Sequence, residues 1–175
     1  MSIVYPRPFE NSYWVIPGKL LVGATPGIAN TEATHSRLRS LKEYGITSII
    51  NLTEADEKDH NGKLFYNYEV SPAAGQLSIY RFPIRDMDIP SPVTMAKILA
   101  LIDRELNTDR RVYVHCWGGL GRTGTVVGCY LLQRKIVNAA YVFDHIRELK
   151  SASHFLAKFE SPQTAAQREF VEEWE

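Results

Sequence analysis

The sequence predicts a single α/β domain over residues 1–175, with a central, mostly parallel mixed sheet flanked by helices on both faces. Strand-like segments alternate along the chain with segments of helical spacing. One strand-like segment, Ile46–Leu52, is β-branched and almost wholly apolar, which is typical of a strand buried on both faces of a parallel sheet. A chain of 175 residues, 45% of them hydrophobic, can bury one substantial core, which favours one domain over two.

The first half of the chain reads as two short strands, a helix, a buried strand and a charged loop. Pro17 and Gly18 provide a turn between the first two strands, which should form a hairpin-like edge of the sheet. Gly45 stands where a helix commonly ends. The expected ranges, in the same order, are 13–16, 20–23, 31–44, 46–52 and 54–61.

The second half of the chain continues the alternation of strands and helices. Ser91 and Pro92 suit the N-cap and the first turn of a helix. Its apolar side chains recur at helical spacing and should pack in the core: Met95, Ile98, Leu99, Ile102 and Leu106. We expect strands at 78–84 and 111–115, a glycine-rich loop at 116–121, and further helices at 122–133, 138–150 and 161–174, the last opened by Ser161 and Pro162.

Charge and hydropathy exclude several classes of partner. The 20 Lys plus Arg balance the 20 Asp plus Glu, so no global field favours nucleic acid or an anionic membrane. The N-terminus lacks the apolar core of a secretory signal, and the richest apolar run, Ile98–Ile102, is too short to span a bilayer. We therefore expect a soluble, cytoplasmic protein with no nucleic-acid or membrane partner, and we favour a monomer.

The cysteines and histidines give no sign of a metal site. Cys116 and Cys129 are too few for a disulfide framework and lack the paired spacing of a zinc site. The five histidines are scattered, and the acidic residues form no calcium-loop pattern, so we expect no metal and no cofactor. Cys129 lies well into the helix that follows Arg122, so we expect it to be a buried core residue that does not reach Cys116.

The loop after the 111–115 strand carries the chemistry. It places the thiol of Cys116 and the guanidinium of Arg122 at its two ends, just before a helix. Glycines at 118, 119 and 121 let the backbone N–H groups turn inward to cup a phosphate, and the helix N-terminus adds its free N–H groups and positive dipole end. The same donors stabilise a thiolate. The fork of Arg122 matches two phosphoryl oxygens, so the loop predicts a phosphate site with a nucleophile.

This loop has two other interpretations. A lone cysteine at a strand end is usually an inert core residue, but here Arg122 and the glycines accompany it. Gly119–Gly124 also fits the dinucleotide pattern G-x-G-x-x-G. That pattern requires an acidic ribose ligand about 20 residues further on. Ala139, Ala140 and Tyr141 stand there instead, which argues against a nucleotide site.

Residues 115–123 resemble the signature of the protein tyrosine phosphatase superfamily: His-Cys, five residues, Arg, then Ser or Thr. By its length the chain is most similar to the small dual-specificity-type phosphatases. The resemblance implies that Cys116 attacks phosphorus to form a cysteinyl-phosphate and that Thr123 steadies the sulfur as it leaves. It implies that His115 orients the loop from beneath, although a buried core histidine is an equal alternative. Arg122 and the loop backbone would hold the oxyanions: Trp117, Gly118, Gly119, Leu120 and Gly121.

A thiolate nucleophile needs a general acid for the leaving group, and that acid must come from another loop. In this family the acid is an aspartate four residues before a proline, and Asp86 keeps that spacing to Pro90. Asp88 is the alternative acid. Ile84-Arg85 replaces the Trp-Pro that precedes the acid in the larger tyrosine phosphatases, and both aspartates could also be solvated loop residues.

Near the C-terminus, residues 163–170 resemble the segment with which tyrosine phosphatases position the hydrolytic water. Gln163 and Gln167 are one helical turn apart, so they should share a face of the expected helix. Glutamines on an exposed helix without a catalytic role are an equal alternative.

The expected substrate is a phosphorylated protein. Superfamily members that act on inositol phosphates tend to carry lysines in the loop, whereas residues 117–120 here are uncharged. Phosphotyrosine alone, or phosphotyrosine with phosphoserine and phosphothreonine, both stay open, and Trp117 could form part of the rim or pack beneath the loop. The alternatives are a phosphoprotein-binding module with little turnover and a phosphatase for a non-protein phosphate ester.

Overall fold

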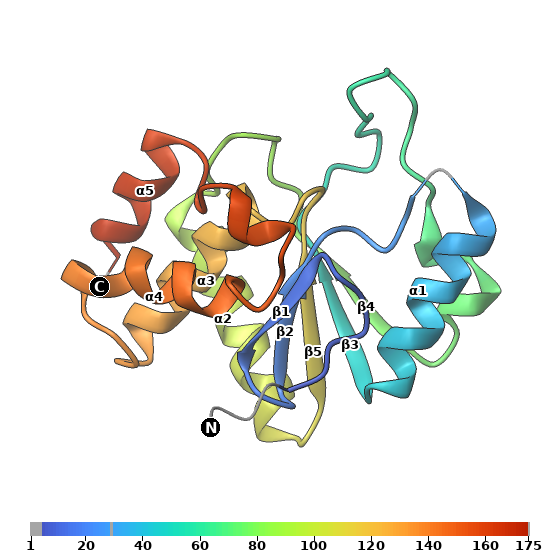
Figure 1. Ribbon diagram of the computed structural model, residues 1–175, viewed down its shortest axis with the longest axis horizontal. Helices are drawn as coiled ribbons and strands as arrows, with labels where there is room; N and C mark the ends of the chain where they lie inside the picture. Colours follow the sequence, from blue (N-terminus) through green and yellow to red (C-terminus); the bar gives the residue numbers. More distant parts are fainter. Residues whose placement is uncertain (1–4, 29, 175) are drawn as a thin grey trace.

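The computed structural model describes residues 5–28 and 30–174, which form one α/β domain with a five-stranded sheet. The strand order is β1-β2-β5-β3-β4, antiparallel between β1 and β2 and parallel elsewhere, so the expected mixed sheet is confirmed. Figure 1 shows α1 on one side of this sheet and the other helices on the opposite side. The strands are β1 Ser12–Ile16, β2 Leu20–Gly23, β3 Ile46–Asn51, β4 Ser78–Arg81 and β5 Arg111–His115. The helices are α1 Thr31–Glu43, α2 Pro92–Asn107, α3 Gly121–Gln133, α4 Val142–Lys150 and α5 Ala165–Glu172.

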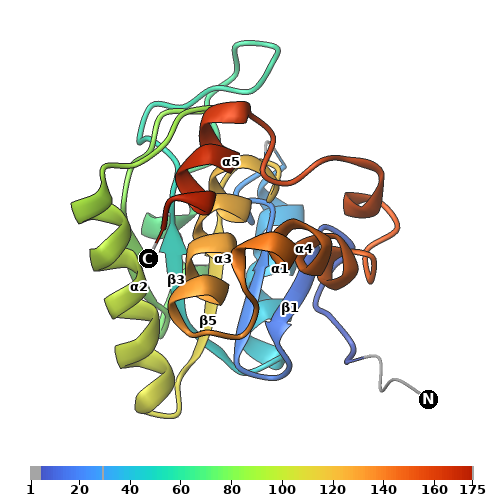
Figure 2. The same cartoon turned by 90° about the vertical axis from the view of Figure 1, so that its left-hand side faces the viewer.

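The near-continuous apolar strands are explained by two cores, one on each face of the sheet. Ile49 and Tyr113 pack on the face covered by α1, together with Leu38. Their neighbours Ile50 and Val114 pack on the face covered by α2 to α5 (Figure 2). Because successive side chains of a strand point to opposite faces, a central strand between two helical layers must be apolar at every position.

The expected N-cap of α2 and the expected glycine after α1 are both confirmed. The Ser91 hydroxyl accepts a hydrogen bond from Thr94 N at the start of α2, and Pro92 occupies the first turn. Asn30 caps α1 in the same way, and Gly45 follows it with a φ of +78°.

Three expected boundaries differ from the structure by more than two residues. Strand β4 ends at Arg81 instead of Ile84, although Phe82 N and Ile84 N still donate to Asn51 O and Leu52 O at 2.9 and 3.0 Å. The helix expected from 138 opens with a separate 3₁₀ turn, Ala139–Tyr141, before α4. The last helix begins at Ala165 instead of Ser161, because Thr164 and Gln167 form a reciprocal capping box.

Among the helices of the described ranges, none has the length and the apolar composition that a membrane-spanning helix needs.

The parallel strands end together at one edge of the sheet, at the top of Figure 1. His115 at the end of β5 is in register with Gly23 of β2 and with Asn51 of β3. The loops that follow these three strands therefore meet around residue 116, where the sequence placed the phosphate site.

Candidate active site

Two carbonyl groups of the loop between β5 and α3 accept hydrogen bonds from neighbouring segments. Trp117 O accepts from Thr25 N at 2.9 Å, and Leu120 O accepts from the Ser161 hydroxyl at 2.7 Å. Further back, His115 O accepts from Leu52 N at 2.9 Å. A loop held in this way by its carbonyls can offer its N–H groups to a phosphate, as a nest does. Leu120 precedes α3 and provides no side-chain cap, so the first N–H groups of that helix add to the nest.

Two glycines in the loop are explained by close packing. Gly119 has a φ of +79°, and a Cβ there would collide with the backbone of Gly23 and Ala24. A Cβ on Gly121 would meet the amide groups of Gln163 and Gln167. Gly118 differs, because a Cβ there meets nothing within 4 Å.

The sulfur of Cys116 lies at the base of the loop and is almost fully buried, the residue being 3% exposed. The Thr123 hydroxyl donates to it at 3.0 Å from the first turn of α3. This contact matches the expected arrangement, in which a hydroxyl stabilises negative charge on the sulfur. Cys129 is fully buried within α3, where burial raises the pKa of its thiol far above the ordinary value. The expectation of a core residue is confirmed.

His115 supports the loop from beneath as a neutral imidazole. Its Nδ1 lies 3.0 Å from Cys116 O, which can only accept, so Nδ1 carries the proton. Nε2 then accepts from the Tyr68 hydroxyl at 2.6 Å. Burial lowers the pKa of His115 to about 3, which keeps the ring uncharged. The residue is therefore both a satisfied core histidine and a support of the loop.

Arg122 is the largest of the fully buried side chains in the described ranges, and its guanidinium forms an ion pair with the carboxylate of Glu57. Its Nη1 and Nη2 donate to the two carboxylate oxygens of Glu57 at 2.7 and 2.6 Å. Nη1 also donates to Ile84 O at 2.9 Å, and Nη2 donates to Asp86 at 2.9 Å. Burial opposes the charge, but the hydrogen bonds and charge of Glu57, with Cys116 and Asp86, outweigh it and raise the pKa of Arg122. Among the described residues its Nε has no partner, which leaves a buried donor for a ligand.

Glu57 is the main residue of this site that the sequence did not reveal. It lies in the loop after β3, which projects above the sheet in Figure 1, and its side chain is only 7% exposed. The sequence shows this loop as a run of several charges without a motif. No local spacing connects it with an arginine 65 positions away, so only the fold could reveal the pair.

The two candidate acids lie in different surroundings. Asp86 lines the cavity above Cys116 and contacts Arg122. Asp88 is absent from the described lining, and its carboxylate accepts from Ile89 N at 2.8 Å. The geometry therefore favours Asp86.

Gln163 and Gln167 both lie near Gly121, but they do not lie on one face of a helix as the sequence predicted. Gln163 precedes α5, so the two do not share a helix face, and that expectation was wrong. Gln167 is fully buried, accepts from Gln163 N at 3.1 Å, and donates to Asp88 O at 3.1 Å. Gln163 lines the cavity. Gln167 thus fixes the segment, and Gln163 is the one that reaches the site.

Trp117 forms part of the rim and packs against the Glu57 loop. Its ring lies 5.8 Å from that of Phe65 and 5.9 Å from that of His60, measured between centroids. It also lines the cavity. Trp117 therefore connects the phosphate loop with the segment that carries Glu57.

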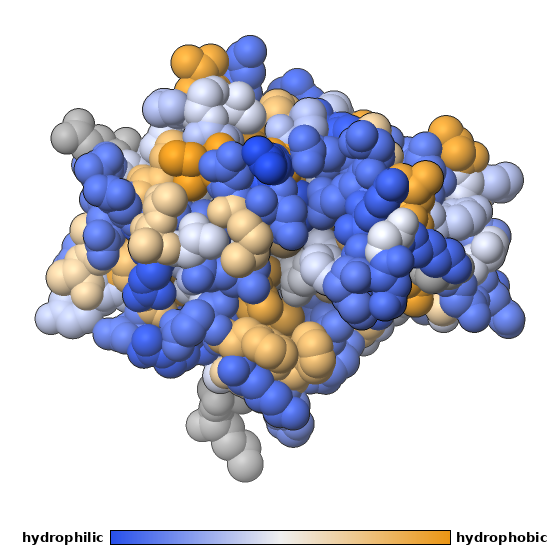
Figure 3. Space-filling model, turned by 90° about the horizontal axis from the view of Figure 1, so that it is seen from above, coloured by the Kyte–Doolittle hydropathy of each residue, from blue (hydrophilic) through white to orange (hydrophobic). Residues whose placement is uncertain are grey.

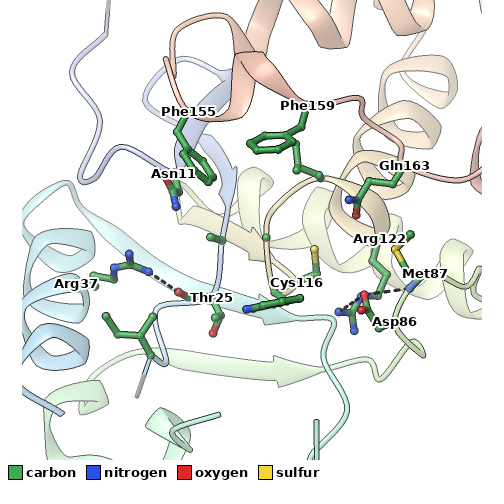
Figure 4. Close-up of a pocket in the computed structure, with 15 residues that line it drawn as sticks. Asn11, Thr25, Arg37, Asp86, Met87, Cys116, Arg122, Phe155, Phe159 and Gln163 are labelled. Carbon is green, nitrogen blue, oxygen red and sulfur yellow. Dashed lines mark hydrogen bonds and ion pairs between the residues drawn. The ribbon is translucent and has the colours of Figure 1, made fainter. Parts of the chain in front are cut away.

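A cavity of about 420 Å³ opens over the thiol, as Figure 4 shows. It brings together residues from the expected loop, the expected acid loop and the expected glutamine segment: Cys116, Trp117, Gly118, Leu120, Arg122, Asp86 and Gln163. Its wall also includes residues that were not expected, among them Arg37, Phe155 and Phe159. Nowhere in the described ranges do three or more His, Cys, Asp or Glu side chains gather as a metal site would require.

The sequence is similar to known phosphatases. Residues 23–135 match the family described as "Polymorphic toxin system, DSP-PTPase phosphatase". Phosphatidylglycerophosphate phosphatase PTPMT2 of Arabidopsis thaliana is 30% identical over 132 residues, which are 75% of this chain and 52% of that protein. Dual specificity protein phosphatase CDC14A of Homo sapiens is 28% identical over 156 residues, or 82% of this chain and 24% of that protein. The chain thus spans about half the length, or less, of these relatives.

The fold is similar to that of solved phosphatases. Tk-PTP in its active form superposes with a TM-score of 0.71 and 20% identity, covering 95% of this chain and 97% of that one. PTPMT1 in complex with PI(5)P gives 0.68 and 18%, covering 93% of each chain. The matched family runs from the end of β2 beyond the end of α3, across the whole phosphate loop. The chain therefore belongs to the DSP-PTPase phosphatases, within the protein tyrosine phosphatase superfamily.

Proposed function

We propose that the protein is a cysteine-dependent protein phosphatase that hydrolyses phosphotyrosine side chains through a cysteinyl-phosphate on Cys116. The observation that carries the proposal is the constellation at the base of the cavity. There the Thr123 hydroxyl donates to the Cys116 sulfur, and the phosphate loop lines the same cavity as the buried Arg122. Together these groups supply a nucleophile, a nest and a phosphate clamp.

In the first step the Cys116 thiolate forms an S–P bond as the P–O bond to the leaving group breaks. The leaving oxygen takes the proton of Asp86, which stands in the same cavity. Arg122 and the loop N–H groups hold the three equatorial oxygens, where charge is spread in the transition state.

In the second step a water molecule forms the new P–O bond and the S–P bond breaks. Asp86, now a carboxylate, accepts the proton of the water, and Cys116 returns to a thiolate held by Thr123. Gln163 in the cavity wall is the candidate to orient this water. Gln167 acts on the position of Gln163 and of the acid loop through its hydrogen bonds.

Protein substrates are favoured because residues 117–121 carry no charge, which leaves Arg122 as the one permanent cation of the loop. One cation and a backbone nest suit a single phosphate ester. The second candidate is a phospholipid monoester, favoured by the similarity to phosphatidylglycerophosphate phosphatases.

The test is turnover of p-nitrophenyl phosphate and of a phosphotyrosine peptide, with and without vanadate and EDTA. We expect vanadate to inhibit and EDTA to have no effect. A phosphoprotein-binding module would bind the peptide without turnover. Rapid hydrolysis of phosphatidylglycerophosphate in vesicles, with slow hydrolysis of phosphopeptides, would favour the lipid substrate.

A further inference from the structure

The cavity contains a second guanidinium besides that of Arg122. Arg37, on α1, lines its wall, and Figure 4 shows it on the opposite side of Cys116 from Arg122. It lies far from the 115–123 signature in sequence and takes no part in the chemistry described above.

We propose that Arg37 binds a second anionic group of the substrate, the carboxylate of an acidic side chain that flanks the phosphorylated residue of a peptide. The inference rests on the proposed function and adds a sequence preference to it.

Neighbouring residues hold one terminal nitrogen and the face of the Arg37 guanidinium. Nη1 donates to Thr25 O at 2.8 Å, and the guanidinium lies over the ring of Phe9, 5.1 Å from its centroid. Thr25 N in turn donates to Trp117 O in the phosphate loop. A single residue therefore connects Arg37 with the loop, so its distance from the phosphate nest is fixed by backbone contacts.

The charge of Arg37 has no counter-ion among the residues that the structure describes. Within the described ranges it forms no ion pair with Asp or Glu, whereas Arg122 contacts both Glu57 and Asp86. The side chain is partly buried, and burial lowers the pKa of Arg37. Withdrawing a cation from water without a partner costs free energy, and an anionic ligand would offset that cost. Arg37 is thus a second cation of this cavity, besides the phosphate-binding Arg122, that can pair with an anionic group of the substrate.

The surroundings of Arg37 favour a peptide over a lipid headgroup. A planar guanidinium matches a carboxylate or a phosphate with two parallel hydrogen bonds, so the rest of the wall decides between them. The rings of Phe155 and Phe159, whose centroids are 5.3 Å apart, give the cavity an apolar wall for neighbouring side chains. Figure 3 shows this end of the molecule as mostly hydrophilic, with separate apolar patches. A surface seated in a bilayer would present a continuous apolar face.

The experiment measures kcat/KM on phosphotyrosine peptides in which a single Glu is moved through the flanking positions, each compared with its Gln counterpart. The variants are Arg37→Gln and, as matched control, Arg39→Gln, which is exposed on the same helix and outside the cavity. We expect wild type to prefer Glu at one or two positions, and Arg37→Gln to reduce that preference about 10-fold. Arg39→Gln should retain the preference.

The outcomes separate this inference from the proposed function. If Arg37→Gln loses the same factor on Glu and Gln peptides, or if wild type hydrolyses all peptides alike, the anion subsite is wrong and the protein phosphatase stands. If wild type hydrolyses no peptide but cleaves phosphatidylglycerophosphate in vesicles, the proposed protein substrate fails as well, and the partner of Arg37 is not a peptide carboxylate.

Discussion

At the scale of single residues, the site depends on how Arg122 is oriented. A free arginine side chain has many rotamers, but here Glu57, Ile84 O and Asp86 hold its two terminal nitrogens. Its Nε remains for the ligand. The two hydrogen bonds to the Glu57 carboxylate therefore fix the plane of the guanidinium before substrate binds. This lowers the entropy cost of binding the phosphoryl group.

Glu57→Gln should lower kcat/KM about 10-fold or more on any phosphate ester, because Arg122 loses a charged, bidentate partner and its orientation. Vanadate affinity should fall in parallel. Asp56→Asn is the control, since Asp56 is the exposed neighbour in the same loop. A kcat/KM of Glu57→Gln within about twofold of that of Asp56→Asn would show that the hydrogen bonds from Arg122 to Glu57 do not affect catalysis.

The acid is tested by leaving-group dependence. Asp86→Asn should cost about 10²-fold on a phosphotyrosine peptide and less on p-nitrophenyl phosphate, because a good leaving group needs little protonation. Asp88→Asn should cost little on either, since its carboxylate lies outside the cavity. A substrate-selective loss in Asp88→Asn with a near-normal Asp86→Asn would reverse the assignment.

At the scale of elements, the strand, loop and helix from Arg111 to Gln133 could be predicted closely, because periodicity and glycine placement are local signals. The start of α5 was missed although its signal was present: Thr164 and Gln167 have the spacing of a capping box. The one-turn spacing of the two glutamines predicted that Gln163 lies on the helix, but the capping box starts the helix only at Ala165. Glu57 could not be predicted, because its partner is distant in sequence and neighbouring loop residues carry the same charge.

The loop provides a matched pair of glycine variants. Gly119→Ala should destabilise the fold by about 1–3 kcal/mol and abolish most activity, because its φ is +79° and a Cβ would strike the Gly23 backbone. Gly118→Ala should change stability little, since a Cβ there meets nothing within 4 Å. Urea unfolding of both variants measures the difference. Equal free energies of unfolding would mean that the packing of Gly119 against β2 is unimportant.

Across the domain, hydrogen bonds connect the phosphate loop and the end of β5 with several distant segments. Loop carbonyls bond to Thr25 after β2 and to Ser161 before α5, and His115 O at the end of β5 bonds to Leu52 after β3. Beneath it, His115 bonds Tyr68 in the β3–β4 connection. Unfolding any of these segments should therefore disturb the site, so stability and activity are coupled through the loop.

The buried His115 predicts how stability depends on pH. Its pKa is about 3 in the folded protein, against an ordinary 6.5, so below pH 6.5 the unfolded chain binds a proton that the folded chain refuses. The contribution of the neutral His115 to the free energy of unfolding is complete above pH 6.5 and is lost as pH falls towards 3. Between pH 7 and pH 5 the free energy of unfolding should fall by about 2 kcal/mol.

Urea unfolding at the two pH values measures this loss, and His154→Gln, which removes an exposed histidine, should leave it unchanged. In NMR spectra of the folded protein, the His115 ring should stay in its neutral form at pH 5. A ring that titrates near pH 6.5 in the folded state would contradict the buried, neutral assignment.

The proposed mechanism requires a covalent intermediate at Cys116. The direct measurement is rapid acid quenching during turnover of a phosphotyrosine peptide, followed by mass spectrometry of the peptide that contains residue 116. We predict the added mass of one phosphoryl group on Cys116 in wild type, more of it in Asp86→Asn if hydrolysis of the intermediate slows, and none in Cys116→Ser. Turnover without an adduct on Cys116, or turnover by Cys116→Ser, would contradict the account.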